Sequence, residues 1–83
     1  MNETTRTALR KFSQVGTWHT IHWADDERFM DFIIAAYRNN DFSISTDEFR
    51  AEFEEIGEHQ EERLSDLYVQ YEQGAALLRR NGG

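Results

Sequence analysis

The chain of 83 residues contains no cysteine and no proline. Without cysteine there can be no disulfide framework and no thiolate metal site, so the composition does not point to secretion. The longest apolar run, residues 32–37, is far too short to span a bilayer. The first residues also lack the apolar core of a signal peptide. We therefore expect a cytoplasmic protein that makes no membrane contact.

The short length limits what the fold can contain. A chain of this size buries only roughly 60 to 65% of its unfolded surface, so a deep catalytic cavity is not expected. We predict one helical domain over residues 1–80. The polar residues 81–83, which include two glycines, are predicted to form a disordered tail.

The first two predicted helices have clear start signals. Asn2 or Thr4 caps a first helix, which Gly16 ends. Asp25 and Asp26 begin a second helix, because carboxylates accept hydrogen bonds from the free amides of the first turn and suit the helix dipole. Apolar residues then recur at spacings of three and four, the helical period.

A third helix begins with the most specific local signal in the chain. The Ser45 hydroxyl can accept from the Glu48 amide while the Glu48 carboxylate reaches back to the Ser45 amide, which makes a capping box. We expect the apolar face of this helix to continue through Phe53 and Ile56. A break is expected at Gly57, because glycine inside a helix costs roughly 1 kcal/mol relative to alanine.

A last helix is predicted to carry apolar residues from Leu64 to Leu78 and to end in two arginines, which suit a helix C-terminus. Residues 17–23 are rich in strand-favouring types, but no second strand is evident, so a strand would need a partner chain. We interpret residues 16–24 as an extended aromatic connector. Three of its side chains are expected to fill the core: Trp18, Ile21 and Trp23. The sequence thus predicts an all-α protein, a small bundle of three to four short helices.

The net charge of −7 is concentrated in the middle of the chain. Residues 25–73 carry fifteen acidic side chains against four arginines, whereas both ends are basic. Such a middle repels nucleic acid and anionic lipid and attracts basic protein surfaces. Direct nucleic-acid binding and membrane binding are therefore not expected.

The densest acidic stretch defines a candidate partner-binding surface. A charge run on a helix is usually a solvated face, but small acidic helical proteins can also inhibit basic partners through such a face. In charge and size the chain resembles the colicin immunity proteins, which inhibit nucleases, and the phage-encoded mimics of DNA. Eight carboxylates are predicted to form the docking surface: Asp47, Glu48, Glu52, Glu54, Glu55, Glu58, Glu61 and Glu62.

Catalysis and metal binding are not predicted. The carboxylates lack the apolar surroundings that would raise a pKa, and the chain has no nucleophile beside a base and no glycine-rich phosphate loop. His19 and His22 lie near two aspartates, but this is not a complete ligand set for zinc, nickel or copper, so they are interpreted as connector histidines. Residues 37–49 end like an EF-hand loop but lack its first aspartate and its glycine. No cofactor is expected.

Several short motifs share a further resemblance. They are the Ala24-Asp25-Asp26 start, the helix at Phe29, the Phe42, Ile44 and Ser45 run, the Asp47-Glu48-Phe49 triplet, and the terminal Gly82-Gly83. Together they resemble the nitrogen-fixation-associated leader-peptide family of ribosomal natural-product precursors, over residues 9–53 and the last two. The resemblance implies a helical domain that a peptide-modifying enzyme binds and a transporter peptidase cuts after the double glycine.

Two functional hypotheses follow. The first is a non-enzymatic interaction module, an inhibitor or immunity-type protein that docks on a basic partner such as a nuclease or another nucleic-acid-binding protein. The alternative is a leader-peptide domain, in which Gly82 and Gly83 form a processing site rather than a frayed tail. The sequence leaves open whether the chain forms a homodimer.

Overall fold

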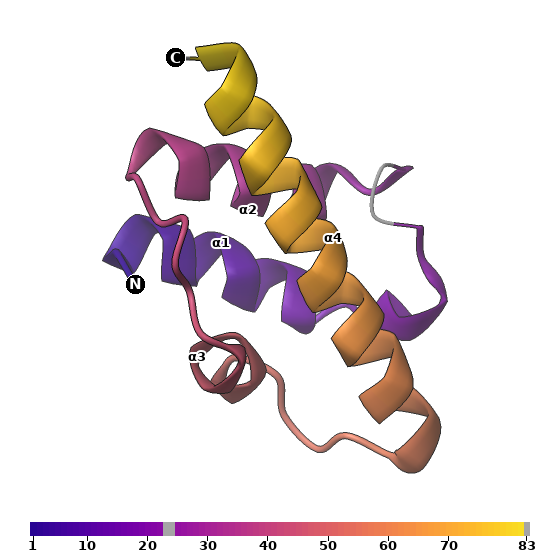
Figure 1. The fold of residues 1–83 in the computed structure, drawn as a ribbon. Helices are drawn as coiled ribbons and strands as arrows, with labels where there is room; N and C mark the ends of the chain where they lie inside the picture. Colours follow the sequence, from indigo (N-terminus) through magenta and orange to yellow (C-terminus); the bar gives the residue numbers. More distant parts are fainter. Residues whose placement is uncertain (23–24, 83) are drawn as a thin grey trace.

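The computed structural model describes residues 1–22 and 25–82, and within these ranges the chain is all-α, as predicted (Figure 1). Four α-helices and the short 3-10 helix η1 occur there, with no strand. In chain order the elements are α1 (Glu3–Ser13), η1 (Trp18–Thr20), α2 (Glu27–Arg38), α3 (Thr46–Ala51) and α4 (Glu58–Gly82).

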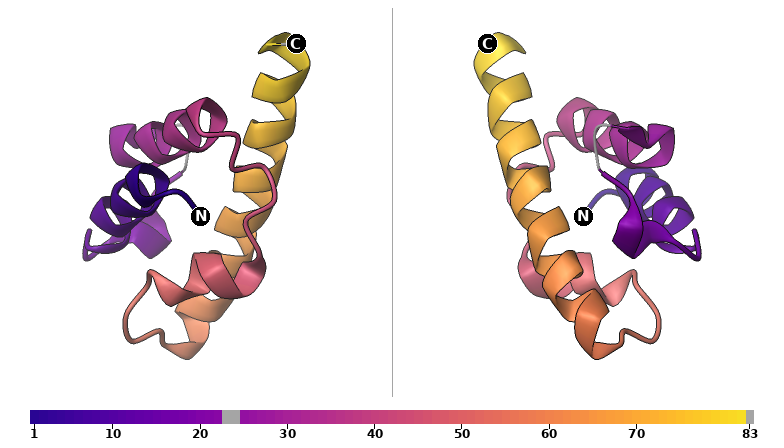
Figure 2. Two further views of the ribbon diagram at one scale, coloured as in Figure 1. Left: turned by 90° about the vertical axis from the view of Figure 1, so that its left-hand side faces the viewer. Right: turned by 90° about the vertical axis from the view of Figure 1, so that its right-hand side faces the viewer.

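The long helix α4 organises the arrangement. It has 25 residues, and the molecule measures 38 × 23 × 20 Å. In both side views of Figure 2, α4 forms one edge of the molecule, and α1 and α2 lie side by side beyond it. The short α3 packs near the end at which α4 begins. The helices α2 and α3 thus both pack against α4, while α1 packs mainly on α2.

Local capping signals explain where the helices begin. The side chain of Asn2 accepts from an amide of α1, and that of Asp26 accepts from two amides of α2. Both hydrogen bonds of the predicted capping box are present: the Ser45 hydroxyl accepts from the Glu48 amide, and the Glu48 carboxylate accepts from the Ser45 amide. Asn40, just after α2, has a φ of 57°, a left-handed conformation that asparagine tolerates. The helix starts depend only on residues a few positions apart, which is why the sequence could predict them.

An aromatic cluster fills the core and draws on every helix. The Phe12 and Phe29 rings meet edge-on with centroids 4.9 Å apart, and so do Phe32 and Phe49 at 5.9 Å. Such pairs contribute about 0.5–1.5 kcal/mol beyond the burial of their area. The buried apolar residues of the cluster are Leu9, Phe12, Trp18, Phe29, Phe32, Ile33, Ala36, Ile44, Phe49, Phe53, Leu64, Leu67, Tyr71 and Ala75.

The connector between α1 and α2 differs from the prediction. Its centre is not extended, because Trp18–Thr20 form a 3-10 turn. Backbone bonds from the Thr20 amide to the Thr17 carbonyl and from the Ile21 amide to the Trp18 carbonyl, at 2.9 and 3.4 Å, satisfy groups that an isolated strand would leave unpaired. Trp18 enters the core as expected and Ile21 is half-buried, while Trp23 lies outside the described residues.

The break between the last two helices is confirmed, but it is wider than predicted. The helix α3 ends at Ala51, so Phe53 and Ile56 lie in the connection of residues 52–57 and not on a helix. Phe53 is nevertheless buried, because its ring packs edge-on against Trp18 and at a tilt against Phe49. Tertiary contacts therefore hold an apolar position that the helical period alone had assigned to α3.

The helix α4 begins at Glu58, six residues before Leu64, the first apolar residue predicted for it. Residues 58–63 include no apolar side chain, but glutamate, glutamine and arginine are good helix formers and acids suit the first turn. At its other end α4 continues through Asn81 and Gly82, although the sequence had assigned both residues to the tail. Gly83 lies outside the described residues.

Gly74 offers a test of this packing. A Cβ added there would lie 3.5 Å from the Ile33 Cγ2 atom, an ordinary van der Waals contact. We expect Gly74→Ala to raise the free energy of unfolding by about 0.5–1 kcal/mol, because glycine weakens a helix interior. Urea unfolding followed by circular dichroism measures the change. Gly74→Leu should instead destabilise the protein through overpacking by about 1–3 kcal/mol, and equal effects of the two substitutions would contradict the described contact.

Candidate protein-interaction surface

The eight carboxylates of the predicted docking surface gather at one end of the molecule, which we call the acidic end. They lie on α3, on the connection of residues 52–57 and on the first turns of α4, which meet at the lower end of the molecule in Figure 1. They come together because α3 packs against α4. The structure then divides them into two groups, according to whether a cation of the same chain binds them.

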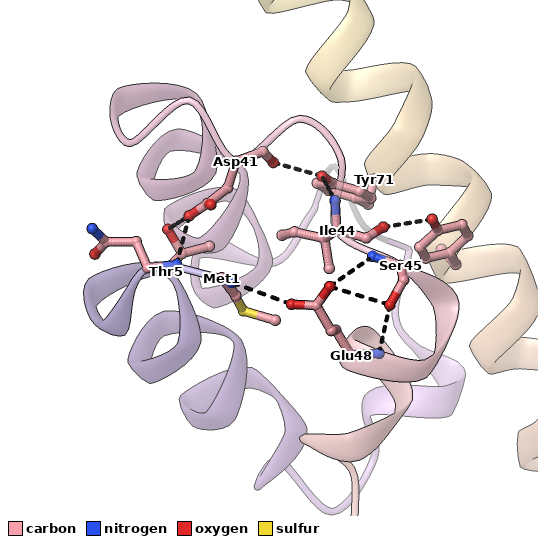
Figure 3. A network of polar contacts seen from close by, with 9 residues as sticks. Met1, Thr5, Asp41, Ile44, Ser45, Glu48 and Tyr71 are labelled. Atoms are coloured by element: carbon pink, nitrogen blue, oxygen red, sulfur yellow. Dashed lines mark hydrogen bonds and ion pairs between the residues drawn. The ribbon is translucent and has the colours of Figure 1, made fainter.

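Glu48 belongs to the group that is used internally (Figure 3). Its carboxylate accepts from the Ser45 amide at 3.4 Å and from the ammonium group of Met1 at 3.2 Å. The hydrogen bond from this ammonium, followed by the one from Ser45, lowers the pKa of Glu48. Glu48 therefore joins the start of α1 to the start of α3.

Glu52 is also bound within the chain. One of its carboxylate oxygens accepts from the Nε and Nη2 atoms of Arg10 at 3.2 and 3.0 Å. The Glu52 side chain is only 7% exposed, whereas that of Arg10 is 52% exposed. Glu52 thus points inward and fastens the connection of residues 52–57 to α1, and it does not present its charge to a partner.

Glu61 forms the third internal pair. The Arg50 guanidinium donates to both of its oxygens, which links α3 to the first turns of α4. This bonding lowers the pKa of Glu61 and raises that of Arg50. Both side chains remain partly exposed, so the pair holds the position of α3 but leaves a neutral patch on the surface.

The remaining carboxylates are all exposed, and we call them the free carboxylates. In the described part of the chain, none of them makes an ion pair or a side-chain hydrogen bond. They are Asp47, Glu54, Glu55, Glu58 and Glu62. Five exposed negative charges on three adjoining segments produce a strongly negative potential at this end of the molecule.

Two tyrosines of α4 hold the connection of residues 41–45 that leads into α3 (Figure 3). The Tyr71 hydroxyl donates to the Asp41 carbonyl at 2.6 Å and accepts from the Ile44 amide at 3.3 Å. The Tyr68 hydroxyl donates to the Ile44 carbonyl at 2.6 Å. Burial raises the pKa of Tyr71 to about 12. The tyrosines thereby fix α3, and with it Asp47, relative to α4.

The residues of the other candidate sites have structural roles. Asp26 caps α2, and the His19 Nδ1 atom lies 3.3 Å from the Gln60 Nε2 atom. Among residues 1–22 and 25–82 no three histidine, aspartate or glutamate side chains are placed to hold a metal ion. Of the apolar positions that carry the leader-peptide resemblance, Ile44 and Phe49 are only 4% and 1% exposed. Ala24 and Gly83 lie outside the described residues.

Sequence reasoning missed a groove of about 610 Å³ between α1 and α2. The one sequence signal for the groove was Ile34, an apolar residue beside the core face of α2. In the structure this side chain remains 38% exposed. The lining of the groove combines apolar side chains with three cations and two acids, and it includes Ala8, Lys11, Arg28, Ile34, Ala35 and Arg38. It lies away from the acidic end, which α1 and α2 do not form.

Comparison with protein-family models, with curated proteins and with solved structures finds no match to this chain. In the part of the chain that the structure describes, each helix is too short or too polar to cross a membrane. Function must therefore be inferred from the side chains and their arrangement.

The Tyr71 contacts predict a loss of stability in alkaline solution. The folded pKa of about 12 exceeds the ordinary value of 10.0, so the folded state holds this proton more tightly than the unfolded chain. We expect the free energy of unfolding to fall as the pH rises from 10 to about 12. Urea unfolding across this range, for the wild type and for Tyr71→Phe, measures the effect.

The Tyr71→Phe variant should lose less stability over that range. At neutral pH it should be about 1–3 kcal/mol less stable than the wild type, because the Ile44 amide is left buried without its acceptor. Tyr37→Phe is the control, since the Tyr37 hydroxyl makes no hydrogen bond among the described residues. Equal alkaline profiles for the wild type and Tyr71→Phe would show that another group titrates.

The division of the carboxylates can be tested with single amide substitutions. Glu52→Gln should lower the free energy of unfolding by about 1 kcal/mol, because it removes the charge that binds Arg10. Glu54→Gln should leave stability nearly unchanged, because Glu54 is a free carboxylate. Thermal or urea unfolding compares the two. Equal losses would mean that the two groups do not differ in their structural role.

Proposed function

We propose that this chain is a small, non-enzymatic protein-interaction module. It docks its acidic end on a basic protein of the kind that binds nucleic acid, and thereby inhibits that protein. The free carboxylates are the observation that supports the proposal, since they are five exposed charges without an internal ion pair in the described part of the chain. The lack of cysteine agrees with a cytoplasmic role.

The internal ion pairs support the same function in a different way. Glu48, Glu52 and Glu61 fasten α3 and the connection of residues 52–57 to the rest of the fold. The free carboxylates therefore stand on a scaffold that is held in place before a partner arrives. Preorganisation of this kind lowers the entropic cost of association, and the negative potential speeds encounter with a positive surface.

The free carboxylates extend over adjoining segments, which suits a partner whose cationic surface binds a phosphate backbone. Glu58 and Glu62 stand one helical turn apart on α4, roughly 6 Å along its axis. Glu54 and Glu55 extend the negative surface toward the segment of residues 13–18, with which they line a shallow depression. A cationic groove that accepts phosphates would be attracted to this extended negative surface.

A leader-peptide domain is the second hypothesis and has less support. A modifying enzyme would need access to apolar positions such as Ile44 and Phe49, and both are buried among the aromatic rings of the core. The leader hypothesis therefore requires this part of the fold to open on binding. Docking through the acidic end requires no such change.

Charge reversal at the acidic end tests the proposal. We expect the Glu54→Arg, Glu55→Arg, Glu58→Arg triple variant to fold normally and to lose the partner. Affinity should fall roughly hundredfold, because exposed charge pairs contribute up to about 1 kcal/mol each. Affinity capture from the source organism, with mass spectrometry, identifies the partner. Calorimetry with the purified partner then measures the dissociation constant.

A matched control carries the same change in net charge on other faces of the molecule: Glu3→Arg, Asp31→Arg and Glu72→Arg. It should retain most of the partner affinity. Rising salt should weaken the wild-type complex, since screening lengths shorten to about 8 Å at physiological ionic strength. The proposal fails if the acidic-end variant and the wild type retain the same proteins equally, or if the retained protein is not basic.

A further inference from the structure

The outer face of α4 carries a pattern that the fold itself does not use. Six exposed residues follow one another at spacings of four, three, four, three and four, and we call them the outer seam: Glu62, Asp66, Val69, Gln73, Ala76 and Arg80. The buried residues of α4, among them Leu67 and Tyr71, lie on the opposite side of the helix. Residues at alternating spacings of three and four form one stripe along a helix, and a second helix that packs on this face would contact that stripe.

Apolar side chains occur near the middle of the outer seam, although they are few. Val69 is 47% exposed, and Leu77, which flanks the seam, is 55% exposed. Within residues 1–22 and 25–82 the one other exposed large apolar residue is Ile34, at 38%. In Figure 2 the α4 helix forms the edge of the molecule, with α1 and α2 on its inner side. A second helix could therefore approach this face.

The charges of the outer seam are arranged with opposite signs at its two ends. Glu62 and Asp66 lie toward the start of α4, and Arg80 lies toward its end. The Asp66 Oδ2 atom lies 3.9 Å from the Nη1 atom of Arg63 on the same helix. Glu62 and Arg80 make no ion pair with any described residue. A helix with this pattern is complementary to a copy of itself that runs in the opposite direction.

We propose that two copies of the chain pair through α4 in an antiparallel arrangement. With the twofold axis level with Tyr71, Glu62 of each copy faces Arg80 of the other, and Val69 faces Gln73. A parallel arrangement would instead place Glu62 against Glu62 and Arg80 against Arg80, and like charges in contact repel. Antiparallel pairing is therefore the arrangement that the outer seam favours.

The dimer goes beyond the proposed function and does not depend on it. Because the twofold axis crosses the middle of α4, the two acidic ends would lie at opposite ends of the dimer. Of the free carboxylates, only Glu62 would be engaged, so the others would remain available to a partner. The seam has few large apolar side chains, so we expect a weak dimer in which the charge pairs fix the register.

A charge-swap experiment tests the pairing, with sedimentation equilibrium as the measurement. Glu62→Arg and Arg80→Glu should each weaken dimerisation roughly tenfold, because each replaces two attractive contacts by two repulsive ones. The double variant should regain the wild-type affinity, because the two exchanged side chains would again face each other with opposite charges. Glu54→Arg and Lys11→Glu are controls of equal charge that lie off the seam. Circular dichroism verifies that every variant is folded.

Cysteine cross-linking determines the direction of the helices, since the natural chain has no cysteine. In the antiparallel pair, residue 66 faces residue 76 of the other copy. A mixture of Asp66→Cys and Ala76→Cys should therefore form mixed disulfides. Each variant alone should form few, because like positions lie roughly 15 Å apart along the axis and a disulfide needs Cα atoms within about 7 Å.

Three results would overturn the proposal. The first is a chain that stays monomeric at millimolar concentration. The second is a dimer whose affinity neither single charge reversal changes, which would place the interface elsewhere. The third is efficient cross-linking of like positions, which would show a parallel pair. None of these results bears on partner binding through Glu54, Glu55 and Glu58, so the two proposals can fail separately.

Discussion

The hydroxyl of Tyr71 is the contact on which the arrangement of the second half of the chain depends. It donates to the Asp41 carbonyl and accepts from the Ile44 amide, so one buried side chain satisfies two backbone groups of a connection that has no secondary structure. The connection leads directly into α3. A six-residue helix has little stability of its own, so its place on α4 must come from contacts of this kind.

The carboxylates illustrate how one residue type takes two roles in a small acidic protein. Where a cation of another segment lies within reach, as Arg10 does for Glu52, the acid becomes a tie between elements. Where none does, as at Glu54, the acid remains exposed and its charge adds to the field of the whole molecule. The internal ion pairs hold the segments that carry the exposed carboxylates, so the negative charges keep fixed positions. A protein that recognises basic surfaces needs such fixed charges.

The helix α4 combines these roles because its faces differ. Its inner face supplies Leu67 and Tyr71 to the core, its first turns belong to the acidic end, and its outer face carries the seam around Val69. A helix of 25 residues in a chain of 83 is long enough to do this, since it extends over nearly the whole length of the molecule. The proposed dimer and the proposed partner surface can therefore coexist on one element.

The sequence by itself determined the all-α class, the capping box at Ser45 and the acidic stretch, because each follows from residues close together in the chain. It narrowed the caps of α1 and α2 to two residues each, and the structure selects Asn2 and Asp26. Only the tertiary structure decided that α3 ends at Ala51, that the connector turns at Trp18, and which carboxylates are free. Those outcomes depend on contacts between distant segments, such as Glu52 with Arg10. The sequence shows which residues are charged, but the packing of distant segments in the folded protein determines which charges form ion pairs.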